Sequence, residues 1–86
     1  MTLNESFKKV NEEVPMSTEK DINTAILSLQ ESATKIWQAV ENNQQDKINT
    51  RAANALISVF NVMRDLGINN PEECLAKRLE ELKSEK

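Results

Sequence analysis

The most informative part of the sequence is residues 46–82, which read DKINTRAANALISVFNVMRDLGINNPEECLAKRLEEL. Its first half carries apolar side chains at alternating four-residue and three-residue steps, which places them on one stripe of a helix. The stripe consists of Ile48, Ala52, Ala55, Val59, Val62 and Leu66. Gly67 follows it and suits the left-handed backbone position just past a helix end. Asn70 and Pro71 then start a new helix, because Asn70 accepts a backbone hydrogen bond and Pro71 has no amide to leave unpaired. The stretch therefore predicts two helices arranged as an αα-hairpin.

A short helix is predicted at the start of the chain. Apolar side chains step by four, three and four residues through residues 3–14, and Thr2 with Glu5 matches a capping box. Pro15 closes this helix, because the residue before a proline is pushed away from helical dihedrals.

A longer helix is predicted next, capped by Ser17 or Thr18 and ended by the polar run at 41–45. Its expected core stripe is Ile22, Ile26, Leu29, Ala33, Ile36 and Val40. With no clusters of alternating β-branched and aromatic residues, the chain is expected to be all-α, with four helices in up-and-down order.

Size and composition limit the class of protein. The chain has 86 residues, which predicts a single helical domain over residues 1–86 that buries only about 60–65% of its unfolded surface. Its net charge of −3 gives no basic field for generic nucleic-acid binding. No apolar run approaches the roughly 20 residues of a membrane span. The chain has a single cysteine, which cannot form an internal disulfide, and its start lacks the apolar core of a signal peptide. These features predict a cytoplasmic protein.

Missing residue types narrow the chemistry. The chain has no His and no Tyr, so the usual neutral-pH general base is absent. Cys74 follows Glu72 and Glu73, which oppose formation of a thiolate, and no imidazole is present to activate it. Nucleophilic catalysis is therefore not expected.

The two long helices carry more apolar residues than one stripe needs. The extra residues are Ala25, Leu27 and Trp37 on one helix and Leu56, Ile57, Phe60 and Met63 on the other. Faces this wide predict packing on two sides, once within the chain and once against a second copy. The predicted interface residues are Trp37, Leu56, Phe60 and Met63. The alternative is that Trp37, Phe60 and Met63 fill the core of a monomer.

The order of the helices and residues 48–82 resemble the MazG-type all-α nucleoside triphosphate pyrophosphohydrolases, over a match of residues 29–82. Leu66, Gly67 and Ile68 are similar to the Leu-Gly-Ile that ends the third helix of that family. Residues 76–80 resemble its Ala-Lys-x-x-Lys segment. The resemblance implies a four-helix MazG-like bundle that self-associates as a dimer or tetramer.

The resemblance also implies where Mg²⁺ would bind. The chemistry of the family needs a Glu-x-x-Glu pair on the second helix and a Glu-x-x-Asp pair on the third, which together hold Mg²⁺ on the triphosphate. In this chain Ser32 and Lys35 occupy the first pair, just after Glu31, and Arg51 and Asn54 occupy the second. None of the four acids is present, so no metal ligand, catalytic residue or cofactor is expected in a conventional site.

These substitutions favour an anion instead. Lys35, Arg51 and Asn54 donate hydrogen bonds to phosphate or carboxylate, and Arg does so bidentately. Together with Glu31 they are the predicted ligand-binding residues. The alternative is that they are solvated or paired locally, for example Glu31 with Lys35 four residues later.

Three functions remain open. The first is a non-catalytic MazG-like binding module for a protein partner or a phosphorylated small molecule. The second is a Mg²⁺-dependent nucleoside triphosphate pyrophosphohydrolase that uses Glu31, Glu41 or Asp46 from displaced positions or from a second subunit. The third is a plain helical interaction protein that shares only the architecture.

Overall fold

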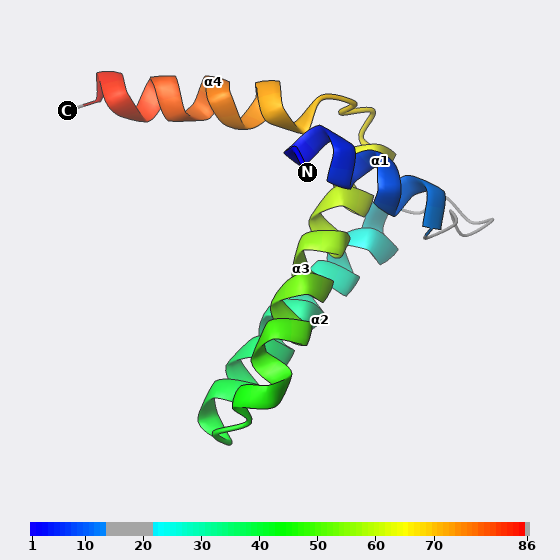
Figure 1. The fold of residues 1–86 in the computed structure, drawn as a ribbon, viewed down its shortest axis with the longest axis vertical. Helices are drawn as coiled ribbons and strands as arrows, with labels where there is room; N and C mark the ends of the chain where they lie inside the picture. The colour runs from blue at the N-terminus through cyan, green and yellow to red at the C-terminus, as the bar shows by residue number, and fades with distance from the viewer. Residues whose placement is uncertain (14–21, 86) are drawn as a thin grey trace.

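The computed structural model describes residues 1–13 and 22–85, and all regular structure in these ranges is helical. Figure 1 shows the four helices. They are α1 (Leu3–Glu13), α2 (Ile22–Glu41), α3 (Gln45–Asp65) and α4 (Pro71–Ser84). The prediction of an all-α chain with four helices is confirmed. The predicted stop at Pro15 and the predicted cap at Ser17 or Thr18 lie outside the described residues.

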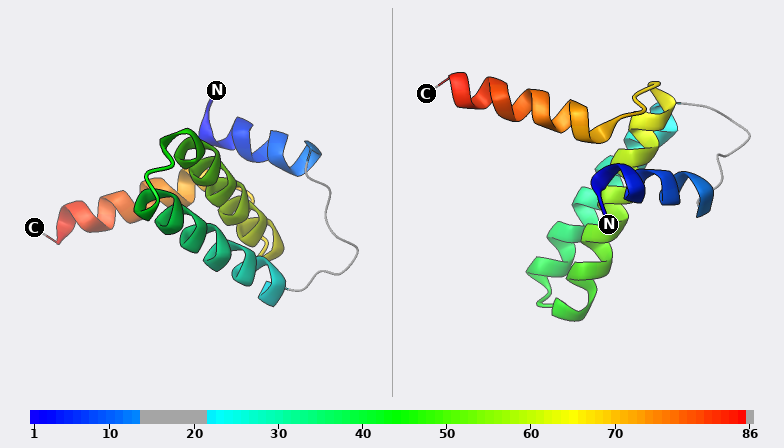
Figure 2. Two further views of the ribbon diagram at one scale, coloured as in Figure 1. Left: turned by 90° about the horizontal axis from the view of Figure 1, so that it is seen from below. Right: turned by 45° about the horizontal axis from the view of Figure 1, so that its top comes forward.

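α2 and α3 form an antiparallel hairpin and lie side by side in every view (Figures 1 and 2). They are joined by residues 42–44, within the polar run that was predicted to be a loop. Asn43 adopts a φ of 53° there, a left-handed conformation that asparagine tolerates better than most residues. The hairpin therefore consists of the second and third helices.

Large and small side chains alternate along the side of α2 that packs on α3. Ala39 is only 1% exposed, and the buried and half-buried positions of α2 recur at alternating three- and four-residue steps. These positions are Ile22, Ala25, Leu29, Ser32, Ile36 and Ala39. Part of each predicted stripe was wrong, because the seam of α2 also runs through Ala25, Ser32 and Ala39 and is therefore turned to one side of the predicted stripe. The predicted members that are exposed are Ile26, Ala33 and Val40 on α2, Ala52 on α3, and Leu66 just past the end of α3.

The junction between α3 and α4 follows the sequence prediction. Gly67 has a φ of 79°, its amide donates to the Arg64 carbonyl (3.1 Å), and the Ile68 amide donates to the Met63 carbonyl (2.9 Å). These bonds make a Schellman motif that satisfies carbonyls at the end of α3. Asn70 Oδ1 then accepts from the Glu73 amide at 3.1 Å and caps α4.

α4 does not fold back along α3, so the predicted α3–α4 hairpin and the up-and-down order fail at this helix. α4 leaves the hairpin at a wide angle (Figure 1). Its first turn is bound to α1 instead. Asn4 Nδ2 donates to Asn70 Oδ1 (2.8 Å), and Asn4 Oδ1 accepts from the Glu72 amide (3.0 Å). Because Pro71 is also buried, the start of α4 is fixed while the rest of the helix projects outward.

α1 packs against α3 and completes a small core. The rings of Phe7 and Phe60 meet edge to face, with centroids 5.5 Å apart and an interplanar angle of 70°. The capping box of α1 is confirmed, because the Glu5 amide donates to Thr2 Oγ1 (3.1 Å) and the Thr2 amide donates to Glu5 Oε1 (3.4 Å). In the described part of the chain, the buried hydrophobic side chains are Phe7, Ala39 and Phe60. Most of the apolar surface therefore stays partly exposed.

Candidate functional site

One side of the α2–α3 hairpin is a polar cleft with a volume of about 270 Å³. All four predicted ligand-binding residues line it. Glu31 and Lys35 lie on α2, one turn apart, and Arg51 and Asn54 lie on α3, three residues apart. The residues that line the polar cleft are Ser28, Glu31, Ser32, Lys35, Arg51, Asn54, Ile57, Ser58 and Asn61.

A pair of serines fixes the register of the two helices at the cleft. Ser32 Oγ and Ser58 Oγ are 3.1 Å apart. Ser32 Oγ also donates to the Ser28 carbonyl at 2.9 Å, so its own proton is used and Ser58 is the donor between the helices. Ser58 is only 6% exposed, and a buried hydroxyl is stabilised by such a partner.

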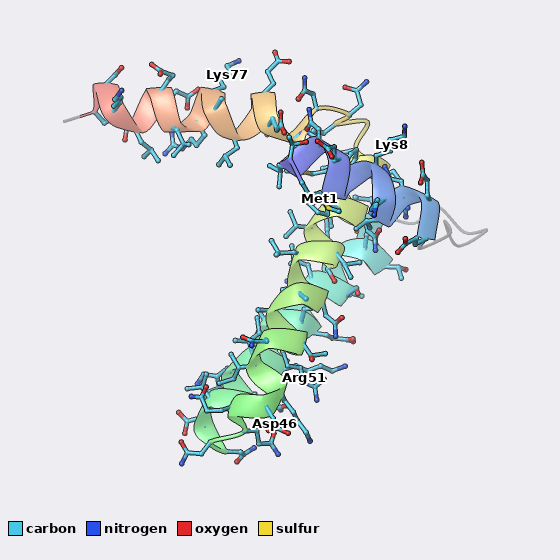
Figure 3. The ribbon with its side chains drawn as sticks, viewed as in Figure 1. Met1, Lys8, Asp46, Arg51 and Lys77 are labelled. Carbon is cyan, nitrogen blue, oxygen red and sulfur yellow. The ribbon has the colours of Figure 1, made fainter. Side chains whose placement is uncertain are left out.

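This register places the two cations at the same end of the cleft. Lys35 is about one turn from the serine pair toward the 42–44 loop, and Arg51 is about two turns from it in the same direction. Figure 3 labels Arg51 near Asp46, at the loop end of the hairpin. Ser28 and Asn61 lie beyond the serine pair on its other side. The polar cleft therefore has a cationic end and a neutral end.

The cations are not neutralised by local pairing. Within the described ranges, no carboxylate oxygen lies within 4.0 Å of the Lys35 or Arg51 side-chain nitrogens. The alternative pairing of Glu31 with Lys35 is thus not formed, although both line the cleft. Two cations and one acid give the polar cleft a formal charge of +1 in a chain whose net charge is −3.

Sequence reasoning missed the neutral end of the cleft. Asn61 Oδ1 is buried and has no hydrogen-bond partner among the residues that the structure describes. An unpaired buried amide oxygen costs free energy, so a donor group that reached Asn61 Oδ1 would be stabilised there. The signal was present, because Arg51, Asn54, Ser58 and Asn61 recur at three- and four-residue steps on one helix.

The three acids that would act in the enzyme hypothesis do not lie together. Glu31 is the one carboxylate in the lining of the polar cleft, and neither Glu41 nor Asp46 reaches it. In residues 1–13 and 22–85, no three side chains of His, Cys, Asp or Glu are grouped so that they could hold a metal ion. Cys74 lies in the first turns of α4 and lines a different depression.

The predicted interface residues divide between surface and core. Trp37 and Leu56 are 63% and 59% exposed, whereas Phe60 is 7% exposed and packs on Phe7 inside the chain. For Phe60, packing therefore follows the monomer-core alternative. Met63 is half-buried and lies with Leu56 and Phe60 in an apolar groove, to which Trp37 does not contribute.

Comparisons with protein-family models, with curated proteins and with solved structures return no match to this chain. The resemblance to the MazG-type family stays a prediction that rests on the residues quoted above. None of the helices in the described ranges has the length and apolar character needed to span a membrane.

Proposed function

We propose that this chain is a non-catalytic, MazG-like helical binding module whose polar cleft holds a phosphorylated small molecule. The observation that carries the proposal is the pair of cations, Lys35 and Arg51, which line one cleft with Asn54 and have no carboxylate partner among the residues that the structure describes. Guanidinium and ammonium groups bind phosphate through charge-assisted hydrogen bonds, which are stronger than neutral ones.

The size and polarity of the cleft support a small anion. A volume of about 270 Å³ lies just below the range of roughly 300–1,000 Å³ that is usual for drug-sized ligands. Such a space suits the phosphates of a nucleotide better than a whole nucleotide. A phosphate would lie between Lys35 and Arg51, and the neutral part of the ligand would extend toward Ser28 and Asn61.

Binding rather than turnover follows from the charges at the expected metal positions. Positive charge at Lys35 and Arg51 opposes a divalent cation at the same place. The proposal includes self-association as a dimer or tetramer, because Trp37 and Leu56 leave large apolar side chains in solvent. A second candidate function is the binding of a protein partner, because these two exposed apolar side chains can also pack against another protein. In that case the chain is an interaction protein that shares only its architecture with the family.

Isothermal titration with inorganic pyrophosphate and with nucleoside triphosphates tests the proposal. We expect binding without Mg²⁺, and a loss of affinity of at least about tenfold in Lys35→Glu and in Arg51→Glu, since a charged hydrogen bond contributes about 1.5–3 kcal/mol. Lys8→Glu is the matched control, because it makes the same charge change on the exposed surface of α1 (Figure 3). Circular dichroism of each variant verifies its helical content.

Two results would overturn the proposal. Affinity unchanged by both cleft reversals would place the ligand elsewhere or leave only a protein partner. Release of pyrophosphate from a triphosphate in the presence of Mg²⁺ would establish the enzyme, with Glu31, Glu41 or Asp46 acting from displaced positions.

A further inference from the structure

An apolar groove of about 350 Å³ lies where α3 and α4 diverge. Leu56, Val59 and Met63 of α3 form one wall, and Leu75 of α4 forms the other. Leu56 and Asn54 are two residues apart on α3, which is about 200° around the helix, so the groove and the polar cleft lie on different sides of the hairpin. The full lining of the apolar groove is Leu3, Leu56, Val59, Phe60, Met63, Pro71, Cys74, Leu75 and Arg78.

The rest of α4 presents an apolar stripe that nothing in the described chain covers. Leu75, Leu79 and Leu82 step by four and three residues, so they share one helix face, and they are 51%, 54% and 43% exposed. An isolated helix shorter than about 12–15 residues is only marginally stable in water. α4 has 14 residues, so it needs packing along this face beyond the bonds that hold its first turn.

We propose that the stripe of α4 packs into the apolar groove of a second copy of this chain, and that the two copies exchange their α4 helices reciprocally. Stripe and groove are continuous in one chain, because Leu75 belongs to both. A two-fold axis then lets each copy fill the groove of the other with the same contact made twice, as in an isologous dimer.

The chain exposes more surface than a compact monomer of its mass, and the excess is large enough for a dimer interface. The chain exposes 6696 Å², whereas a compact monomer of 9.8 kDa exposes about 5,200 Å². The radius of gyration is 14.6 Å, against about 12 Å for a compact domain of this length. A standard interface buries about 800 Å² per partner, which the excess of roughly 1,500 Å² can supply.

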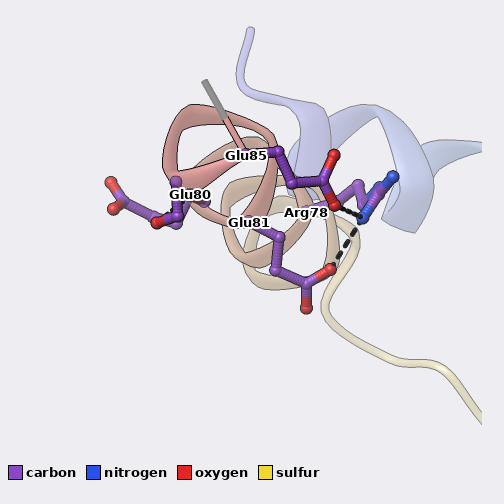
Figure 4. A network of polar contacts seen from close by, with 5 residues as sticks. Arg78, Glu80, Glu81 and Glu85 are labelled. Atoms are coloured by element: carbon purple, nitrogen blue, oxygen red, sulfur yellow. Dashed lines mark hydrogen bonds and ion pairs between the residues drawn. The ribbon is translucent and has the colours of Figure 1, made fainter.

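Charge does not oppose the contact. Arg78 is the one charged residue in the lining of the apolar groove, and it is paired within its own helix. Its Nη1 lies 3.0 Å from Glu81 Oε2 and 3.7 Å from Glu85 Oε1 (Figure 4). The pairs stay at the border of the stripe, where polar groups commonly rim an apolar interface.

The inference rests on the self-association part of the proposed function and adds which elements make the contact. It does not depend on a ligand in the polar cleft. A dimer that forms without α4 would refute this inference and leave self-association standing.

Sedimentation velocity of the full chain and two variants gives the first test. We expect a dimer for the unaltered chain and a dissociation constant at least about tenfold weaker for Leu79→Glu. Lys77→Gln is the matched control, because it changes the charge by the same amount on the face of α4 that points away from the hairpin (Figure 3). A monomeric unaltered chain, or a Leu79→Glu dimer as tight as that of Lys77→Gln, would overturn the inference.

Photo-crosslinking then separates exchange between copies from closure of α4 on its own chain. A benzophenone amino acid is placed at position 79, which lies outside the groove lining of its own chain. We expect a covalent dimer whose cross-linked peptide contains residues 56–63. A cross-linked monomer, or a dimer joined only at other residues, would contradict the exchange.

Discussion

At Gly67 the path of the chain depends on the absence of a side chain. Its φ of 79° is strained for any residue with a Cβ, yet a Cβ built there would meet no atom within 4 Å. The cost of a substitution is therefore conformational and not steric.

We predict that Gly67→Ala lowers the free energy of unfolding by about 1 kcal/mol. Gly67→Asn should lower it less, because asparagine tolerates the left-handed conformation. Urea denaturation followed by circular dichroism measures both. Equal stability of the alanine variant and the unaltered chain would show that the left-handed turn is not needed.

Sequence reasoning at the scale of residues identified the cationic end of the cleft and missed its neutral end. Lys35, Arg51 and Asn54 drew attention because acids were expected there. Asn61 does not lie at a position where an acid was expected, so the sequence did not single it out. The burial of its side chain depends on how closely α2 approaches α3. That approach is a tertiary contact, marked by the Ser32–Ser58 hydrogen bond, and local sequence does not determine it.

The boundary between α3 and α4 was predictable, but the direction of α4 was not. Capping and turn residues act within a few positions, so Asn70 and Gly67 marked the ends of helices correctly. The direction of α4 depends on Asn4, which is distant in sequence and binds the first turn of α4. The seam of α2 also differed from prediction, because it includes Ala25, Ser32 and Ala39, which the predicted stripe left out.

The hydrogen bonds between Asn4 of α1 and the start of α4 predict how a substitution of Asn4 changes stability. Asn4→Ala removes the Nδ2 group that donates to Asn70 Oδ1, and it leaves the Glu72 amide without its Asn4 Oδ1 acceptor. We expect the free energy of unfolding to fall by about 1–2 kcal/mol, which is typical for hydrogen bonds lost in this way. Asn69→Ala is the control at an exposed loop position, and its stability should stay within about 0.5 kcal/mol of the unaltered chain.

Chemical denaturation of both variants checks this prediction. If the two substitutions have the same effect, the bonds of Asn4 do not hold α4, and the direction of the helix has another cause.

The whole molecule separates its two candidate surfaces. The polar cleft lies between α2 and α3, and the apolar groove lies between α3 and α4, with no residue in both linings. α3 thus presents a polar side to a ligand and an apolar side to a second copy. A ligand and a second copy are therefore expected to bind without competing for the same residues.

Phosphate binding at the cationic end of the polar cleft can be measured residue by residue. The most direct measurement is a titration of the ¹⁵N-labelled chain with inorganic pyrophosphate, without Mg²⁺, followed by ¹H–¹⁵N correlation spectra. We predict saturable shifts of amide signals from residues around Lys35, Arg51 and Asn54, which disappear in Arg51→Glu and persist in Lys8→Glu. Spectra that do not change, or changes confined to residues outside the polar cleft, would contradict the proposed binding of phosphate.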